Sequence, residues 1–206
     1  MNEQAREITC VAIDLTTHCD RRCPDCCCGI GINRKLQHHP WEYFERAAQF
    51  IYGIERLHVT GGEPTIHPQF AEFISRFRDL FGCETMTLQT DCFRTEQHAD
   101  VLKHFNHIYV SEYDERNRPA VGLVQLNHPS TKWAGEFTPR SNRGSGQPCA
   151  RGFSETVAYA DGKLYGCCVA PGVDGAVGMV PTKDWKARIV DEPLPCGECW
   201  FSPEVA

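Results

Sequence analysis

Three cysteines near the start of the chain have the spacing of a metal site: Cys19, Cys23 and Cys26. They follow a short apolar run from Cys10 to Leu15. Zinc sites and complete iron–sulfur sites usually take four protein ligands. Three thiolates in one tight loop therefore favour a four-iron cluster in which one iron stays open to another molecule.

A second segment, Gly61–Pro64 with the sequence GGEP, follows another short apolar run at 57–59. Glycines have no Cβ and let a backbone approach a ligand closely. Glu63 offers a negatively charged acceptor to an ammonium group. The segment therefore has the groups needed to hold an amine-bearing ligand against the backbone.

Together the two motifs resemble those of the radical S-adenosylmethionine (radical SAM) superfamily. The resemblance implies that the three cysteines hold a 4Fe-4S cluster whose fourth iron is chelated by the amino and carboxylate groups of S-adenosylmethionine. It also implies that the GGEP segment contacts this amino group, which gives the cofactor-binding candidates Gly61, Gly62, Glu63 and Pro64. The chain departs from the superfamily pattern at Asp25, where an aromatic residue usually supports the adenine region.

The composition is that of an ordinary globular protein, with 41% hydrophobic residues in a chain of 206. That length accommodates one domain, or one domain with a small appendage. The sequence has no signal peptide and no apolar run of about 18 residues, so we expect a cytoplasmic protein that does not span a membrane.

The cysteine count and the charge narrow the function further. Thirteen cysteines are an odd number, and their clustered spacings indicate metal in a reducing compartment and not disulfides. The formal charge of −6 gives no electrostatic footprint for nucleic acid, although a local basic patch remains compatible with it. We therefore expect no nucleic-acid partner.

Strands and helices alternate after the cysteine loop. Apolar residues recurring every three or four positions predict helices at 41–57, 70–81 and 95–105, the second ending at Gly82. Strands are predicted at 57–60, 85–90, 107–111 and 121–126. The alternation predicts an α/β fold with parallel strands, in which sites gather at the carboxyl ends of the strands. The resemblance implies a partial (β/α)6 barrel. With the apolar run at 10–15 counted as a strand, five strands precede residue 130, which indicates a trimmed barrel.

Polar residues follow two of these strands, at 89–91 and 111–114. Radical SAM enzymes often bind the ribose hydroxyls at the end of the fourth strand, and Ser111 is the candidate there. Residues 128–148 are polar and lack periodicity, which predicts a linker or active-site loop. The predicted division is therefore a radical SAM core at 1–127, this loop, and a C-terminal region at 149–206.

A second group of cysteines lies in the C-terminal region. Strands predicted at 156–159 and 163–165 flank the turn sequence Asp161-Gly162, which favours a β-hairpin. The hairpin would bring together the cysteines on either side of it, and a C-x2-C pair near the end would complete a four-thiolate site. The predicted ligands are Cys149, Cys167, Cys196 and Cys199.

On the residues alone, this second site is either an iron–sulfur site or a structural zinc site. Cys168 adjoins Cys167 and is an alternative ligand. The region resembles the Twitch and SPASM extensions of radical SAM enzymes, which carry auxiliary 4Fe-4S clusters. Because too few cysteines remain for two clusters, the resemblance implies a Twitch-like region with one.

The resemblance implies an oxidoreductase-like enzyme that cleaves S-adenosylmethionine reductively into methionine and a 5′-deoxyadenosyl radical. The radical would abstract a hydrogen atom from a small polar substrate and lead to oxidation or rearrangement. An auxiliary cluster with four protein ligands has no open iron, so it would conduct electrons. The expected electron donor is a protein of the flavodoxin or ferredoxin type.

Three other functions remain open from the sequence. One is epimerisation or crosslinking of a peptide by the same radical chemistry. Another is activation of a glycyl-radical enzyme, which the second cysteine group disfavours. The last is a non-catalytic iron–sulfur or zinc module, which the GGEP segment disfavours.

Overall fold

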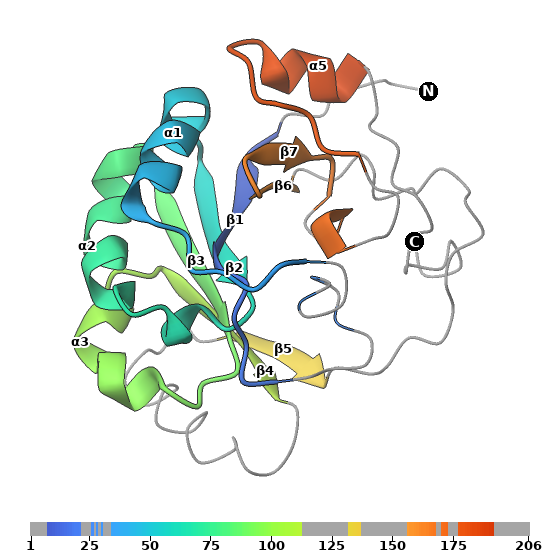
Figure 1. Cartoon of the computed structure of the whole chain (residues 1–206). Helices are drawn as coiled ribbons and strands as arrows, with labels where there is room; N and C mark the ends of the chain where they lie inside the picture. The colour runs from blue at the N-terminus through green and yellow to red at the C-terminus, as the bar shows by residue number, and fades with distance from the viewer. Residues whose placement is uncertain are drawn as a thin grey trace.

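A seven-stranded sheet forms the centre of the protein in the computed structural model (Figure 1). The structure describes residues 8–21, 26, 28, 30, 34–112, 132–136, 156–167, 170–172 and 177–191. The strand order is β5-β4-β3-β2-β1-β6-β7, and every neighbouring pair is parallel except β6 and β7. This parallel-dominated sheet confirms the predicted α/β fold class.

The strands are β1 (Cys10–Thr16), β2 (Arg56–Gly61), β3 (Thr85–Thr90), β4 (His107–Glu112), β5 (Lys132–Glu136), β6 (Thr156–Ala160) and β7 (Lys163–Tyr165). The helices are α1 (Trp41–Ile51), α2 (Phe70–Phe81), α3 (Ala99–Leu102) and α5 (Trp185–Asp191). Short 3₁₀ turns are η1 (Pro64–Ile66), η2 (Thr95–His98) and η3 (Ala170–Gly172). Helices α1, α2 and α3 all lie on one face of the sheet (Figure 1).

The core lies between these helices and the sheet. Alternate residues of each strand point to the same face, so every second residue of β1 and β2 packs against the helices. The phenylalanines of α1 and α2 meet them at a three- and four-residue spacing. The fully buried side chains include Val11, Ile13, Leu15, Phe44, Leu57, Val59, Phe70, Phe73, Phe77 and Phe81. These phenylalanines therefore form much of the core between the helices and the sheet.

The other face of the sheet is polar. His58 of β2 points away from the core, because its neighbours Leu57 and Val59 are buried among the helices. The His58 Nδ1 atom lies 2.8 Å from Thr87 Oγ1 of β3, and its ring meets that of Tyr109 of β4 edge to face. The strands therefore present a row of polar side chains on the face that α1 to α3 leave uncovered.

Two helices differ from the sequence prediction. Helix α1 ends at Ile51 and not at residue 57, because Tyr52 is extended and Gly53 has a φ of +76°. The predicted helix at 95–105 is a 3₁₀ turn followed by the single turn of α3. By contrast, α2 ends as predicted, with Gly82 in the left-handed conformation.

Part of the predicted loop at 128–148 is wrong. Strand β5 lies in this range and pairs in parallel with β4, with Tyr109 opposite Lys132. The strand sequence lacks apolar alternation because β5 is an edge strand, where a lysine is common and backbone pairing supplies the contact. The further strand predicted at 121–126 lies outside the described residues.

The predicted hairpin is confirmed, and the structure shows that it belongs to the central sheet. Strands β6 and β7 are antiparallel, and both turn residues, Asp161 and Gly162, have positive φ. Strand β6 also pairs in parallel with β1, with Cys10 opposite Thr156. The hairpin therefore extends the central sheet directly.

Helix α5 packs beside the carboxyl-terminal end of α1, at the edge of the core. The indole Nε1 of Trp185 donates to the Phe50 carbonyl oxygen at 2.8 Å, and Trp185 is fully buried. In the part of the chain that the structure describes, no helix is long and apolar enough to span a bilayer.

Candidate active site

The cysteine loop and the GGEP segment lie side by side at the carboxyl ends of neighbouring strands. The loop follows β1, the segment follows β2, and these strands pair in parallel. The Gly62 amide donates to the Thr16 carbonyl oxygen at 2.8 Å. The Glu63 amide donates to the His18 carbonyl oxygen at 2.9 Å. Two backbone hydrogen bonds thus join the predicted motifs directly before Cys19.

Both glycines of the segment are required by this close approach. A Cβ on Gly61, whose φ is +128°, would overlap the Thr16 carbonyl oxygen. A Cβ on Gly62 would overlap the His18 carbonyl oxygen and lie 3.2 Å from the Cβ of Cys19. The glycines were predicted to let a ligand approach, and among the described residues they admit the backbone of the cysteine loop.

The Glu63 carboxylate is buried and accepts four hydrogen bonds from the protein. Its Oε1 atom accepts from the Thr65 amide, the Thr65 hydroxyl and the Thr90 hydroxyl, at 3.1, 2.6 and 2.8 Å. Its Oε2 atom accepts from the Asp91 amide at 2.8 Å. Burial, together with the neighbouring Asp91 carboxylate, raises the pKa of Glu63. The side chain therefore fixes the end of β3 against the GGEP segment.

Two ion pairs connect the cysteine loop with the residues after β3. Arg21 Nε lies 3.3 Å from Asp91 Oδ2, and its guanidinium stacks over the Phe93 ring. Arg94 pairs with Asp20 at 3.6 Å. Asp91 belongs to the polar residues that follow β3. It is 3% exposed and is paired with Arg21 of the cysteine loop. Arg21, a cation inside the cysteine loop, is the sequence feature that could have indicated a nearby carboxylate.

Of the three predicted cluster ligands, the structure describes Cys19 and Cys26, whereas Cys23 lies outside the described residues. No group of three potential ligands is assembled within that described part. The Arg21 amide donates to the Cys19 sulfur at 3.4 Å. Burial raises the pKa of the Cys19 thiol to about 12, which metal coordination would reverse because a coordinating thiol is deprotonated.

These observations fit an iron–sulfur cluster. Amide hydrogen bonds to the sulfur ligands are one of the means by which a protein sets a cluster's potential. The Arg21 amide is already placed to make such a bond. The partly exposed Cys26 and the half-buried Cys19 lie in one loop at the edge where the GGEP segment ends.

The chain segment that returns from the cysteine loop is held against the end of β1. The Thr17 hydroxyl donates to the Lys35 carbonyl oxygen at 2.7 Å, and the Thr17 amide donates to the Gln37 carbonyl oxygen at 2.9 Å. Thr16 Oγ1 lies 2.9 Å from His38 Nδ1. The base of the cysteine loop is therefore closed by residues on both of its sides.

A buried arginine joins this returning segment to the β6–β7 hairpin. Arg34 pairs with Asp14 of β1, and its Nε lies 3.1 Å from Asp161 Oδ2. The Gln37 amide nitrogen Nε2 donates to Asp161 Oδ1 at 3.1 Å. Burial raises the pKa of Asp14, while the Arg34 guanidinium opposes that shift. The sequence analysis missed this contact, because no motif relates residue 34 to residue 161.

The histidines near the site have structural partners. His67 Nδ1 accepts from the Gln69 amide at 3.1 Å, so its Nε2 carries the proton and donates to the His39 carbonyl oxygen at 3.0 Å. The rings of His18 and His38 are stacked, with centroids 4.3 Å apart. His67 therefore stabilises the loop through these two hydrogen bonds.

Ser111 lies where the sequence placed it, at the carboxyl end of β4. Gln89 Nε2 of β3 donates to Ser111 Oγ at 2.5 Å, and both side chains are half-buried on the polar face of the sheet. The pair lies on the same edge as the GGEP segment, since β2, β3 and β4 are adjacent and parallel.

Of the second cysteine group, only Cys167 is described. It follows β7, is 7% exposed, and its carbonyl oxygen accepts from the Ala170 amide at 3.2 Å. Cys149, Cys196, Cys199 and the alternative ligand Cys168 lie outside the described residues. Elsewhere, Cys10, Cys83 and Cys92 are buried, in agreement with their predicted apolar role.

Curated relatives are similar to about half of the chain. The GTP 3′,8-cyclase of Hydrogenovibrio crunogenus is 26% identical over 103 residues, which are 48% of this chain and 31% of the relative. The GTP 3′,8-cyclase of Geobacter sulfurreducens is 32% identical over 92 residues, 42% of this chain and 28% of the relative. The chain thus matches about a third of the length of these relatives.

Solved structures with the same fold cover more of the chain. BtrN in complex with AdoMet and 2-DOIA superposes with a TM-score of 0.67, at 12% identity, over 89% of this chain and 82% of that protein. Streptococcus suis SuiB bound to the precursor peptide SuiA gives 0.53 at 13% identity, over 91% of this chain and 66% of SuiB. Both likenesses cover a larger share of the chain than the curated relatives do.

The family model of the radical SAM superfamily matches residues 13–113, from β1 to just beyond β4. That superfamily uses a 4Fe-4S cluster together with S-adenosylmethionine, and the match contains both the cysteine loop and the GGEP segment. Residues 13–113 of this chain are therefore similar to the radical SAM domain of that superfamily.

Proposed function

We propose that the protein cleaves S-adenosylmethionine reductively to a 5′-deoxyadenosyl radical and abstracts a hydrogen atom from a small polar substrate, leading to oxidation or rearrangement. The observation that carries this proposal is the junction between the two motifs. The GGEP amides donate to the backbone just before Cys19, and both glycines lack the room for a side chain. This junction supports a single ligand position shared by the cysteines and the GGEP segment.

Cys19, Cys23 and Cys26 would hold the cluster, with Cys26 assigned by its spacing. The cluster and S-adenosylmethionine would supply the one-electron chemistry, and the protein supplies position and the exclusion of water. Gly61, Gly62, Glu63 and Pro64 would contact the amino group, and the four donors to the Glu63 carboxylate would hold the segment in place for that contact.

The polar face of the sheet supports a small polar ligand. Ser111 and Gln89 are placed to meet ribose hydroxyls or the substrate, and they already orient each other through one hydrogen bond. Direct hydrogen bonds from buried polar groups are the usual source of specificity for hydroxyl-bearing ligands. A flavodoxin- or ferredoxin-type donor in the cytoplasm would provide the electron.

The test is the formation of 5′-deoxyadenosine by anaerobically reconstituted protein under reduction. Wild-type protein should release the nucleoside, and a triple variant with Cys19→Ala, Cys23→Ala and Cys26→Ala should release none. Cys83→Ala is the matched control, because Cys83 is a buried core residue away from both motifs. Nucleoside production by the triple variant would refute the ligand assignment.

We also propose that Cys149, Cys167, Cys196 and Cys199 hold one auxiliary 4Fe-4S cluster in a Twitch-like region at 149–206, beyond a radical SAM core at 1–127. The buried Cys167 directly after the hairpin supports this. Metal analysis tests it: about eight irons per chain are expected, whereas about four irons with one zinc would identify a structural zinc site.

A peptide substrate is the second candidate. The structural neighbour SuiB is described with a bound precursor peptide, and its fold extends over most of this chain. Deuterium transfer from a labelled substrate into 5′-deoxyadenosine separates the two classes. Transfer from small hydroxylated compounds supports the first candidate, and transfer only from peptides supports the second.

A further inference from the structure

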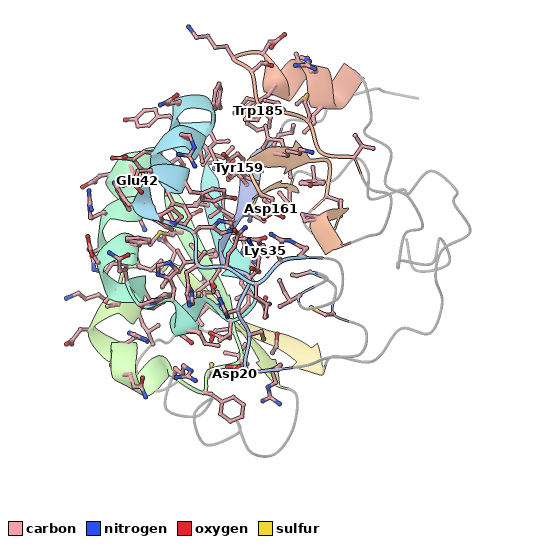
Figure 2. All side chains as sticks on the ribbon, in the orientation of Figure 1. Asp20, Lys35, Glu42, Tyr159, Asp161 and Trp185 are labelled. Carbon is pink, nitrogen blue, oxygen red and sulfur yellow. The ribbon has the colours of Figure 1, made fainter. Side chains whose placement is uncertain are left out.

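A pocket of about 390 Å³ opens beside the segment that follows the cysteine loop, and none of its described lining residues belongs to the two motifs. Its walls come from three segments: residues 34–40 after the cysteine loop, the first turns of α1, and the β6–β7 turn. Its volume is at the lower end of the range for small-molecule pockets. In Figure 2, Lys35 and Asp161 mark two of these walls.

The pocket is lined by three cations, Arg34, Lys35 and Arg46. Arg34 is already paired with Asp14 and Asp161. Lys35 and Arg46 are exposed, and neither has a carboxylate within 4.0 Å among the described residues. In a chain with a formal charge of −6, these two cations give this pocket a locally positive character.

Among the described residues of the pocket wall, Asp161 is the one acidic residue, and its carboxylate is engaged by other residues of the wall. One carboxylate oxygen accepts from Arg34 and the other from Gln37 Nε2. A ligand in the pocket would therefore meet a carboxylate whose oxygens are both engaged, and two cations that are not.

Three buried nitrogen atoms of the wall make no hydrogen bond within the described residues: Arg34 Nη1, Arg34 Nη2 and His39 Nε2. Of these, Arg34 Nη1 is ion-paired with Asp14, and the other two have no such partner in that part of the chain. The residues themselves are 8% and 3% exposed. A buried donor without a partner is unfavourable, so an acceptor brought in by a ligand would be stabilised there. This observation is independent of the surface charges and points to a ligand with several oxygen atoms.

The start of α1 favours the same sign of ligand. Pro40 is the N-cap residue, makes no side-chain capping hydrogen bond, and lines the pocket together with Tyr43 of the first turn. The amino-terminal end of a helix of this length carries a partial positive charge that attracts anions. Its contribution adds to those of Lys35 and Arg46.

We propose that this pocket binds the phosphate group of a small organic ligand, with Lys35 and Arg46 as its main charge partners. The volume exceeds the need of a single inorganic ion and leaves space for an organic part beside the stacked rings of His39 and Tyr43. The site goes beyond the proposed radical chemistry, which uses none of these residues.

The experiment is calorimetric titration of the full chain at constant ionic strength with ribose 5-phosphate, ribose and inorganic phosphate. Ribose 5-phosphate should bind with one-to-one saturation, and ribose should not bind. The double variant Lys35→Gln, Arg46→Gln should weaken binding about tenfold or more. The matched control, Lys103→Gln with Lys183→Gln, removes two exposed lysines outside the pocket and should leave binding unchanged.

A second variant gives an effect of opposite sign. Asp161→Asn keeps an acceptor for Gln37 and a residue type that tolerates positive φ, but it removes the negative charge. Binding of ribose 5-phosphate should become about threefold tighter. Saturation absent at about 10 mM ligand, or equal weakening in the control, overturns the proposal. Equal affinity for inorganic phosphate would replace it with a free-phosphate site.

Because binding is measured without reductant or S-adenosylmethionine, the result is independent of nucleoside production. Failure of the radical reaction would leave the pocket intact, and failure of phosphate binding would leave the radical reaction intact.

Discussion

The cysteine loop is held on two sides by contacts of different kinds. On the side of β2, its backbone packs against Gly61 and Gly62 with no room for a side chain. On the side of β6, the segment that follows it contacts the hairpin through the side chains of Arg34, Gln37 and Asp161. The first contact fixes geometry by excluded volume, and the second fixes it by charge and hydrogen bonding.

This difference matters for function. A cofactor that must meet a reacting atom needs its support positioned within a fraction of an ångström, and backbone packing provides that. The hairpin needs only to be kept near the loop, and side chains suffice for that. The two contacts should therefore respond differently to substitution.

The largest effect is expected at the first contact. Gly62→Ala places a Cβ against the His18 carbonyl oxygen, which can move only if the cysteine loop moves. We expect a loss of more than about 4 kcal/mol of unfolding free energy, or a protein that no longer takes up its first cluster. Urea unfolding and iron content measure both outcomes.

Gly166→Ala is the matched control for this change, because a Cβ there meets no heavy atom within 4 Å and no positive φ is involved. It should retain iron and stability. Normal iron content in Gly62→Ala would show that the first contact is not governed by excluded volume.

At the second contact, Arg34→Gln leaves the Asp14 carboxylate buried without its cation. Removing one partner of a buried ion pair costs about 3–5 kcal/mol. The exposed pair of Arg76 with Glu72 is the control, and Arg76→Gln should cost less than about 1 kcal/mol. Urea unfolding of both variants gives the comparison, and equal losses would contradict the assigned difference in burial.

His58 lies in β2, away from both contacts, and its contribution to the free energy of unfolding depends on pH. Burial lowers the pKa of His58 to about 4 from its ordinary 6.5, so the folded protein binds fewer protons than the unfolded chain between these values. The stability from neutral His58 is present above pH 6.5 and is lost as pH falls towards 4.

The loss should reach about 3 kcal/mol of unfolding free energy across that range. Urea unfolding of metal-free protein at several pH values measures it. His58→Gln should flatten this part of the profile, and a profile of unchanged steepness would show that His58 titrates normally.

The smallest effect is expected at the hairpin turn. Asp161→Asn removes a charge that is 39% exposed but keeps the acceptor for Gln37 and the positive-φ turn. We expect a loss of about 1 kcal/mol or less. Asp161→Ala, which removes both acceptor oxygens, should lose more, and the reverse order would mean that charge alone holds the hairpin.

The sequence predicted the site better than its supports. The GGEP segment after β2, Ser111 at the end of β4 and the Asp161-Gly162 turn depend on local residue types, and the structure has each at the predicted position in the fold. The pairing of β6 with β1 and the contact of Arg34 with Asp161 depend on positions more than a hundred residues apart, which no local pattern encodes.

Element boundaries failed for a related reason. The apolar periodicity of α1 continues to Ile54, which is buried although it lies after the end of the helix. This buried residue made the predicted helix too long. Strand β5 has no apolar alternation because backbone pairing with β4 defines it. The hydrogen bonds of Glu63 with Thr65, Thr90 and Asp91 were not predicted, because these residues meet only in the folded protein.

The central claim is that the junction of the two motifs presents an open iron to S-adenosylmethionine. Electron paramagnetic resonance of the reduced, reconstituted protein with and without S-adenosylmethionine tests it most directly. The spectrum of the first cluster should change on addition of S-adenosylmethionine, and Gly62→Ala should abolish the change. An intact reduced cluster whose spectrum is the same with and without S-adenosylmethionine would contradict it.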